Sequence, residues 1–197
     1  MNAILATTDD FMLALNGTMP WTLIDDFKDI SKMDMKFFRT MTRGANIVMG
    51  YNTWKSMGEK TLPGRGTHYI ITRKNLKSEK DNVIFLPLNK FKEEYVDEEN
   101  LWCIGGAMIY SELIPYCKNI YWNELILEFN KRSKLMESFS SSSNIFLDET
   151  LRKILKTQDT AFYVDLETRV ECDGNGSLLA YHHIYNFSRS NLNNFVK

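Results

Sequence analysis

Short apolar runs alternate with amphipathic segments along the first 113 residues. Runs rich in Val, Ile and aromatic residues predict strands at 2–8, 46–49, 67–72, 83–86 and 101–104. Apolar positions at helical spacing predict helices at 32–42, 53–57, 89–96 and 107–113. Residues 9–23 have neither pattern and are interpreted as a long loop. This alternation is typical of a mostly parallel sheet with helices on both faces.

The pattern changes after residue 113. Strands are predicted at 120–129, 161–170 and 178–187, and the turn sequence Asp-Gly-Asn-Gly at 173–176 indicates a hairpin between the last two. We therefore expect an α/β fold whose mostly parallel, twisted sheet has an antiparallel C-terminal edge. Two long loops are expected at about 22–33 and 131–145, the second containing four consecutive serines at 140–143.

Composition limits the partners. A chain of 197 residues with 44% hydrophobic and 25% charged residues is consistent with one well-buried domain over 1–197. Because the chain has 24 basic and 25 acidic residues, it carries almost no net charge. No overall electrostatic potential therefore favours binding to nucleic acid or to an anionic membrane. The chain shows no signal-peptide pattern and no apolar run of membrane-spanning length. Three cysteines without C-x-x-C spacing predict reduced thiols and a cytoplasmic location.

Asp34 has the most informative position among the acidic residues. It shares one helical stripe with Phe37, Phe38 and Met41, at i, i+3, i+4 and i+7. A carboxylate on such a face is desolvated, which raises its pKa toward the range of a proton-handling group. The alternative interpretation is a helix N-cap in front of a core stripe.

Other residues are also candidates for chemistry, each with a structural alternative. Gly105 and Gly106 lie between a buried strand and a helix, where they fit either a diphosphate or merely a tight turn. Arg65 follows a Pro-Gly turn and is either an anion-binding group or surface charge. The three histidines lack metal-ligand spacing, and His182 and His183 should point to opposite faces of a strand, so no metal is expected.

Six segments occur together in one order: N-G-T-M-P-W (16–21), D-M-K-F-F-R-T-M-T (34–42), I-V-M-G-Y-N-T-W (47–54), L-P-G-R (62–65), I-I-T-R (70–73) and I-G-G-A-M-I-Y (104–110). In sequence and spacing this set resembles the dihydrofolate reductase family. The resemblance extends from residue 16 to 110, and is thinner at I-Y-W-N-E-L (120–125) and 178–187.

The resemblance implies NADPH-dependent reduction of 7,8-dihydrofolate, with hydride to C6 and a proton to N5. Such an enzyme supports one-carbon and thymidylate metabolism and belongs to a class of antifolate targets, and we expect it to be a monomer. It implies catalytic roles for Asp34, for Trp21 and for Asn123, which stands where the family usually has Thr. Asp25 and Asp26 are nearer Trp21 in sequence. The family's block of residues follows Asp34 and not Asp26, so Asp34 is the predicted acid.

The resemblance also implies two sets of binding residues. The predicted folate site is formed by Ile4, Met35, Phe38, Met57, Leu62, Arg65 and Ile104, with Arg65 on the glutamate carboxylate. The predicted NADPH site is formed by Ala6, Leu13, Met19, Gly50, Asn52, Thr53, Thr72, Arg73, Gly105, Gly106, Ala107, Met108 and Tyr110. The chain departs from the family at Leu13-Ala14 and at Tyr51, where a basic residue is common, so Arg73 is expected to bind more of the 2′-phosphate.

Two other functions are compatible with the same fold. One is a reductase of a riboflavin-pathway pyrimidine, which would not be expected to keep the Pro-Trp, D-x-K-F-F and P-G-R segments together. The other is a catalytically idle, folate-binding or structural descendant, which the departures at Ala14, Tyr51 and Asn123 leave open.

Overall fold

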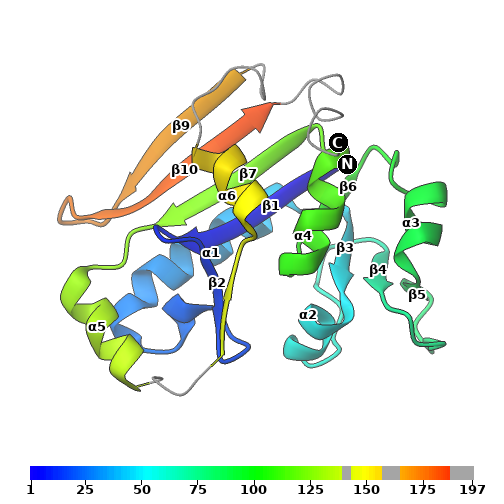
Figure 1. Ribbon diagram of the computed structural model, residues 1–197, viewed down its shortest axis with the longest axis horizontal. Coiled ribbons are helices and arrows are strands. Elements are labelled where there is room, and N and C mark those ends of the chain that lie inside the picture. The colour runs from blue at the N-terminus through cyan, green and yellow to red at the C-terminus, as the bar shows by residue number, and fades with distance from the viewer. Residues whose placement is uncertain (139–142, 157–164, 187–197) are drawn as a thin grey trace.

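A twisted sheet forms the centre of the molecule (Figure 1). The computed structural model describes residues 1–138, 143–156 and 165–186. Within these ranges eight strands are ordered β5-β4-β3-β6-β1-β7-β10-β9. Their bounds are β1 Asn2–Thr8, β3 Asn46–Gly50, β4 His68–Ile71, β5 Val83–Leu86, β6 Leu101–Cys103, β7 Asn119–Leu125, β9 Asp165–Cys172 and β10 Leu178–Asn186. All pairs from β5 to β7 are parallel and β10 is antiparallel to both neighbours, which confirms the predicted fold class.

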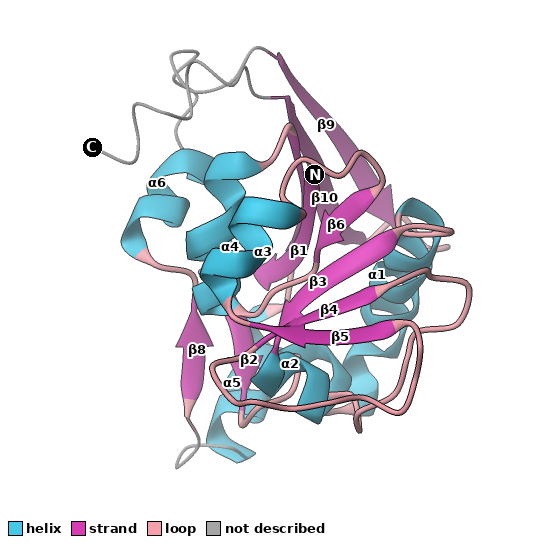
Figure 2. Cartoon of the chain, turned by 90° about the vertical axis from the view of Figure 1, so that its right-hand side faces the viewer, coloured by secondary structure: helices cyan, strands magenta, loops and turns pink. Residues whose placement is uncertain are grey.

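Helices cover both faces of the sheet (Figure 2). Because successive strand residues point to opposite faces, Ile47 and Met49 pack toward α1 (Lys28–Met41) and α2 (Tyr51–Ser56), whereas Val48 packs on the other side. That other side carries α3 (Leu88–Glu94), α4 (Ala107–Leu113) and α6 (Glu149–Lys156). In the described part of the chain, no helix has the length and apolar character needed to cross a bilayer.

The prediction of a loop over residues 9–23 was wrong in two places. Met12–Leu15 forms β2, and Pro20–Thr22 forms a 3-10 turn, η1. β2 pairs antiparallel with β8 (Asn144–Phe146), which is about 130 residues away in the chain. Such a pairing partner gives no local signal in the sequence, so a four-residue strand of this kind is indistinguishable from loop.

The predicted loop at 22–33 was also wrong in its second half. A 3-10 turn, η2 (Asp25–Phe27), leads directly into α1, which begins at Lys28 rather than at Lys32. Phe27 and Ile30 are buried in an apolar cluster, and Ile30 lies four residues before Asp34. The extra residues therefore lengthen the helix by about one turn, and Asp34 lies in its interior rather than at its N-cap.

The segment after β7 contains helices that the sequence analysis missed. The strand predicted to residue 129 ends at Leu125, and most of the expected 131–145 loop is α5 (Phe129–Ser138) followed by β8. α6 was not predicted, although Leu151, Ile154 and Leu155 have helical spacing and are buried. Serines 140–142, residues 161–164 of the next predicted strand and residue 187 lie outside the described residues, and the hairpin turn predicted at 173–176 is confirmed.

Candidate active site

Asp34 lies at the centre of a buried hydrogen-bond network. Its side chain is on the sheet-facing side of α1 and the residue is 5% exposed. Oδ2 accepts a hydrogen bond from Nε1 of Trp21 at 3.2 Å, and Oδ1 accepts one from Nδ2 of Asn123 at 2.9 Å. Burial raises the pKa of the Asp34 carboxyl, and these two hydrogen bonds oppose that rise. The structure thus brings together the three predicted catalytic residues around an acid with an elevated pKa.

Trp21 is held by its position in η1. Pro20 opens this turn, and its fixed φ suits the first residue of a helical turn. The indole is 1% exposed and packs in the apolar cluster that contains Met12, Leu15 and Phe27. A buried indole N–H needs an acceptor, and the Asp34 carboxylate supplies it.

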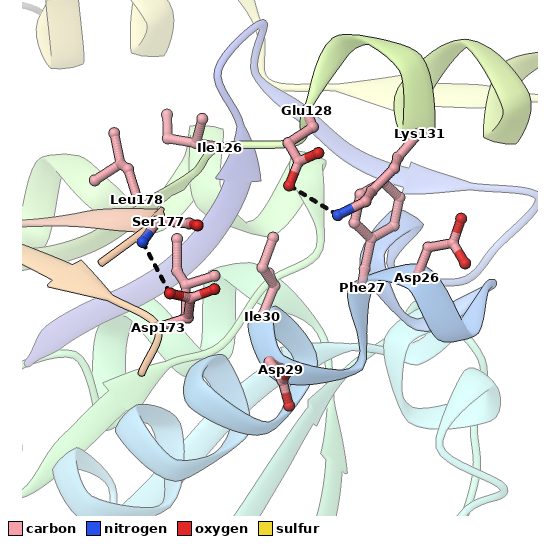
Figure 3. A pocket seen from close by; sticks show the side chains of 11 residues that line it. Asp26, Phe27, Asp29, Ile30, Ile126, Glu128, Lys131, Asp173, Ser177 and Leu178 are labelled. Carbon is pink, nitrogen blue, oxygen red and sulfur yellow. Dashed lines mark hydrogen bonds and ion pairs between the residues drawn. The ribbon is translucent and has the colours of Figure 1, made fainter. Parts of the chain in front are cut away.

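The two rival acids are in a different environment. Asp25 and Asp26 are both exposed. Asp26 lines a polar depression between the start of α1, the start of α5 and the β9–β10 turn, where Glu128, Lys131 and Asp173 also point inward (Figure 3). The burial of Asp34 and its bonds to Trp21 and Asn123 therefore favour it over Asp26 as a proton-handling group.

His182 belongs to the same network and was missed by the sequence analysis. Its Nδ1 lies 2.7 Å from Oδ1 of Asn123, and its ring stacks on Phe37 with centroids 4.6 Å apart. His183, its neighbour in β10, faces the other side of the sheet and stacks on Trp122, as the strand alternation predicted. The alternation of side chains along a strand predicts on which face of the sheet His182 lies. It does not predict the contact with Asn123, because that contact depends on the register between β10 and β7.

Apolar side chains surround one side of this network. Five of the predicted folate-site residues belong to or pack against a single apolar cluster that also contains Trp54 and Trp102: Ile4, Phe38, Met57, Leu62 and Ile104. Met35, the sixth apolar residue predicted there, is half-buried on α1 directly after Asp34. The arrangement can desolvate a flat ring placed against the Asp34 carboxylate.

Arg65 lies where the turn after α2 approaches the end of α1. Its Nε and Nη2 donate to Oγ1 of Thr42 at 3.1 and 2.7 Å, and its Nη1 donates to the Pro63 carbonyl at 2.7 Å. The guanidinium carbon is 5.2 Å from the centre of the Phe38 ring. Burial lowers the pKa of Arg65, and the nearby Arg39 lowers it further. The two neighbouring guanidinium groups make this corner of the site electropositive.

The turn that carries Arg65 is fixed by His68, another residue that the sequence did not single out. The Leu62 backbone N–H donates to Nε2 of His68 at 2.8 Å, and Nδ1 of His68 lies 3.0 Å from the Gly66 carbonyl. Burial lowers the pKa of His68, which favours the neutral ring that this pair of bonds requires. Gly64 has a φ of +72°, which the Pro-Gly turn needs.

Gly105 and Gly106 join β6 to α4 through a cis peptide bond. A Cβ on Gly105 would lie 2.5 Å from the Tyr110 ring, and one on Gly106 would lie 3.2 Å from Oγ1 of Thr53. The Gly105 carbonyl accepts a hydrogen bond from the Gly50 N–H at 2.7 Å. The start of α4 and the start of α2 therefore lie together, and Tyr110 leaves no room for a side chain at Gly105.

The other predicted cofactor residues lie on α4, α2, β1 and β2 or directly before η1. Ala107 and the exposed Met108 begin α4, Asn52 is in α2, and the Tyr110 hydroxyl donates to the Ile4 carbonyl at 2.7 Å, which ties α4 to β1. Ala6 is paired in register with Asn123, Leu13 is half-buried in β2, and Met19 directly precedes η1.

Thr72 and Arg73 follow the end of β4, and Lys74 adds a cation that the sequence analysis did not consider. Arg73 is exposed, and Nζ of Lys74 lies 4.8 Å from the centre of the Tyr51 ring. The Lys74 backbone N–H donates to Oγ1 of Thr72 at 3.1 Å. Tyr51, which stands where a basic residue was expected, therefore holds a lysine against its ring.

Comparison with known proteins gives three consistent matches. A family model described as dihydrofolate reductase matches residues 1–137. The chain is 31% identical over 147 residues to a dihydrofolate reductase of Heliothis virescens, covering 66% of this chain and 75% of that protein. It is also 31% identical over 116 residues to the dihydrofolate reductase of Enterococcus faecium, covering 58% and 64%.

A solved structure also matches. It is described as a dihydrofolate reductase from Enterococcus faecalis complexed with NADP(H) and RAB-propyl, and the match has a TM-score of 0.66 at 21% identity over 95% of both chains. At this identity the likeness concerns the fold.

Proposed function

Because the chain belongs to the dihydrofolate reductase family, we propose that it reduces 7,8-dihydrofolate to 5,6,7,8-tetrahydrofolate with NADPH, using Asp34 as its proton-handling group. The single observation that carries the assignment of Asp34 is its burial between Trp21 and Asn123. The matches give no support to a riboflavin-pathway reductase or to a catalytically idle descendant.

In this proposal Asp34 binds the pterin. Its carboxylate accepts hydrogen bonds from the amino group and a ring nitrogen of the substrate, and so favours the substrate form that carries a proton for N5. Trp21 and Asn123 hold the two carboxylate oxygens in place. Asn123 replaces the Thr usual in the family and retains a donor toward Asp34, so the network is complete without a hydroxyl.

The apolar residues around Asp34 position the substrate and exclude water. Phe38 on α1 and Ile4 on β1 belong to the same cluster and would lie on opposite sides of a flat heterocycle. Arg65, whose guanidinium is already oriented by Thr42, would bind the α-carboxylate of the glutamate tail through a bidentate pair. Met35, Met57, Leu62 and Ile104 complete the proposed folate site.

The glycine pair supports an NADPH site. A Cβ on Gly105 would collide with Tyr110 and one on Gly106 would press on Thr53, so glycine at both positions lets the start of α4 pack closely against the start of α2. We assign the diphosphate to this position, with Thr53 and the first residues of α4 around it. When bound, NADPH supplies the hydride that is transferred to C6.

The 2′-phosphate is assigned to the end of β4. Arg73 provides a planar fork for it, and Thr72 provides a hydroxyl. Lys74, held on the Tyr51 ring, supplies a second cation close to the position that lacks the expected basic residue. The remaining contacts of the cofactor are assigned to Ala6, Leu13, Met19, Gly50, Asn52, Ala107, Met108 and Tyr110.

We further infer a cytoplasmic monomer. All three cysteines lie in the described residues and are free, and burial raises the pKa of the Cys103 thiol to about 12, which makes it unreactive. Sedimentation of the purified chain tests the monomer.

The activity is tested by following NADPH absorbance with the purified chain. We expect NADPH to be consumed only when dihydrofolate is added, with tetrahydrofolate formed in equal amount. Binding of both ligands without turnover would contradict the proposal.

A further inference from the structure

The acid network continues past Asn123 to His182. β10 pairs antiparallel with β7, and His182 is directly opposite Asn123 in the register. Figure 1 shows the two strands side by side. Asp34, Asn123 and His182 thus form one hydrogen-bonded series from three elements, at 2.9 and 2.7 Å. His182 lies beyond residue 137, where the family match ends.

Hydrogen-bond complementarity fixes the orientation of the Asn123 amide. An ionised carboxylate only accepts, so Nδ2 of Asn123 must face Asp34 and Oδ1 must face His182. Oδ1 also only accepts, so Nδ1 of His182 must carry a proton. The neutral Nδ1–H tautomer and the imidazolium both satisfy this requirement. The Nε2–H tautomer would place two acceptors 2.7 Å apart and would favour a flipped amide.

The surroundings of His182 hold the ring in place. It is 7% exposed and stacks on Phe37 of α1 with an interplanar angle of 15°. Two charged groups of β9 lie near it, Glu171, whose Oε2 is 4.0 Å from Nε2, and Arg169. His183, on the opposite face of β10, acts on the ring only through its charge. Burial lowers the pKa of His182, Glu171 opposes this, and His183 and Arg169 add to it, so the neutral ring is favoured at physiological pH.

We propose that His182 is a positioning residue for the reductase: by donating Nδ1–H to Oδ1 of Asn123, it fixes the amide so that Nδ2 donates to Asp34. The importance of this role for catalysis rests on the proposed function. Without the His182 donor, the amide is free to turn its oxygen toward Asp34. That arrangement opposes the ionised carboxylate and favours its protonated form, while Trp21 continues to hold Oδ2.

The test compares two substitutions of His182. His182→Phe keeps an aromatic ring against Phe37 but has no donor, whereas His182→Asn places an amide donor near the position of Nδ1. In the ligand-free protein the titration of Asp34 is followed by the ¹³C NMR signal of its carboxyl, assigned by its loss in Asp34→Asn. We expect His182→Phe to raise the pKa of Asp34 by about half to one unit, and His182→Asn to remain near wild type.

The kinetic measurement is the pH profile of single-turnover hydride transfer. We expect the apparent pKa in His182→Phe to move in the same direction as that of Asp34. The rate of hydride transfer at the low-pH plateau of this variant should be about three- to tenfold lower than in wild type, because the Asp34 carboxylate is no longer held in one orientation. His183→Phe is the matched control, since it changes the adjacent residue on the opposite face of β10 and should leave both profiles unchanged.

The ¹⁵N NMR shifts of His182 in the wild-type protein give a test that does not depend on the folding of a variant. A protonated Nδ1 is expected, and an Nε2–H tautomer would overturn the proposal. An unchanged Asp34 titration in a folded His182→Phe would also overturn it, leaving His182 a packing residue. If wild type failed to reduce dihydrofolate while the Asp34 titration still shifted, the link between His182 and Asp34 would stand and the proposed function would fail.

Discussion

Trp21 and Asp34 are joined by a hydrogen bond of 3.2 Å although twelve residues separate them in the chain. The intervening residues form η1, η2 and the first turns of α1, so they coil back over a short distance instead of spanning it. The twelve residues at 22–33 therefore do not prevent the hydrogen bond between Trp21 and Asp34. It follows that the acid cannot be identified by counting residues from the tryptophan.

Replacing Asp34 tests its catalytic role. Asp34→Asn is nearly isosteric but has no carboxylate, so we expect hydride transfer at neutral pH to fall by about 10² or more, with partial recovery in acid where the substrate protonates itself. Asp26→Asn, which changes an exposed residue of the depression in Figure 3, should alter the rate by less than about twofold. If Asp26→Asn lowered the rate and Asp34→Asn left it unchanged, Asp26 would be the catalytic acid.

The burial of Asp34 also has a consequence for stability. Because its pKa is raised in the folded protein, the native state holds a proton that the unfolded state releases above about pH 4. Stability is then lost as pH rises through the folded-state pKa. Asp34→Asn lacks this loss, so we expect the free energy of unfolding of the variant, minus that of wild type, to increase from pH 4 to pH 8. Urea unfolding across this range measures it, and a constant difference would contradict the raised pKa.

Arg65 tests whether the substrate carries a glutamate tail. A charge-assisted pair contributes about 1.5–3 kcal/mol, so Arg65→Ala should lower kcat/KM for dihydrofolate roughly ten- to a hundredfold. A dihydropterin without glutamate should be reduced equally by variant and wild type, and Arg43→Ala, at an exposed position, is the control. Equal losses for both substrates would mean that Arg65, through Thr42, only supports the fold.

Arg73 and Lys74 test the 2′-phosphate site. Both are exposed, so we expect Arg73→Ala and Lys74→Ala each to raise the KM for NADPH about three- to tenfold while leaving the KM for NADH unchanged. Steady-state kinetics with the two cofactors measure the difference. Lys77→Ala, a nearby exposed lysine, should change neither value. An effect of Lys74→Ala on both cofactors would place the lysine elsewhere.

The strands and helices of the parallel part of the sheet were predictable from the sequence. Apolar runs such as 46–49 and 83–86 are short and end at Gly50 and Pro87, so their length, composition and boundaries identify them as strands. The glycine pair at 105–106 was also singled out from the sequence, as either a diphosphate site or a tight turn. Only the structure shows that a side chain at Gly105 would collide with Tyr110.

The sequence by itself thus determined the order of the strands and helices in the parallel part of the sheet and the residue types of the site. Only the tertiary structure decided which side chains meet: Trp21 with Asp34, Asn123 with His182, and β2 with β8. Each of these contacts joins segments whose spacing is set by sheet register or by helix packing. The register of a strand is fixed by the burial of one complete face of that strand. Helix α1 begins at Lys28 because Phe27 and Ile30 are buried in an apolar cluster formed with other segments. The free energy of these contacts comes from packing between segments that are distant in the chain. It therefore produces no periodic pattern within any single segment.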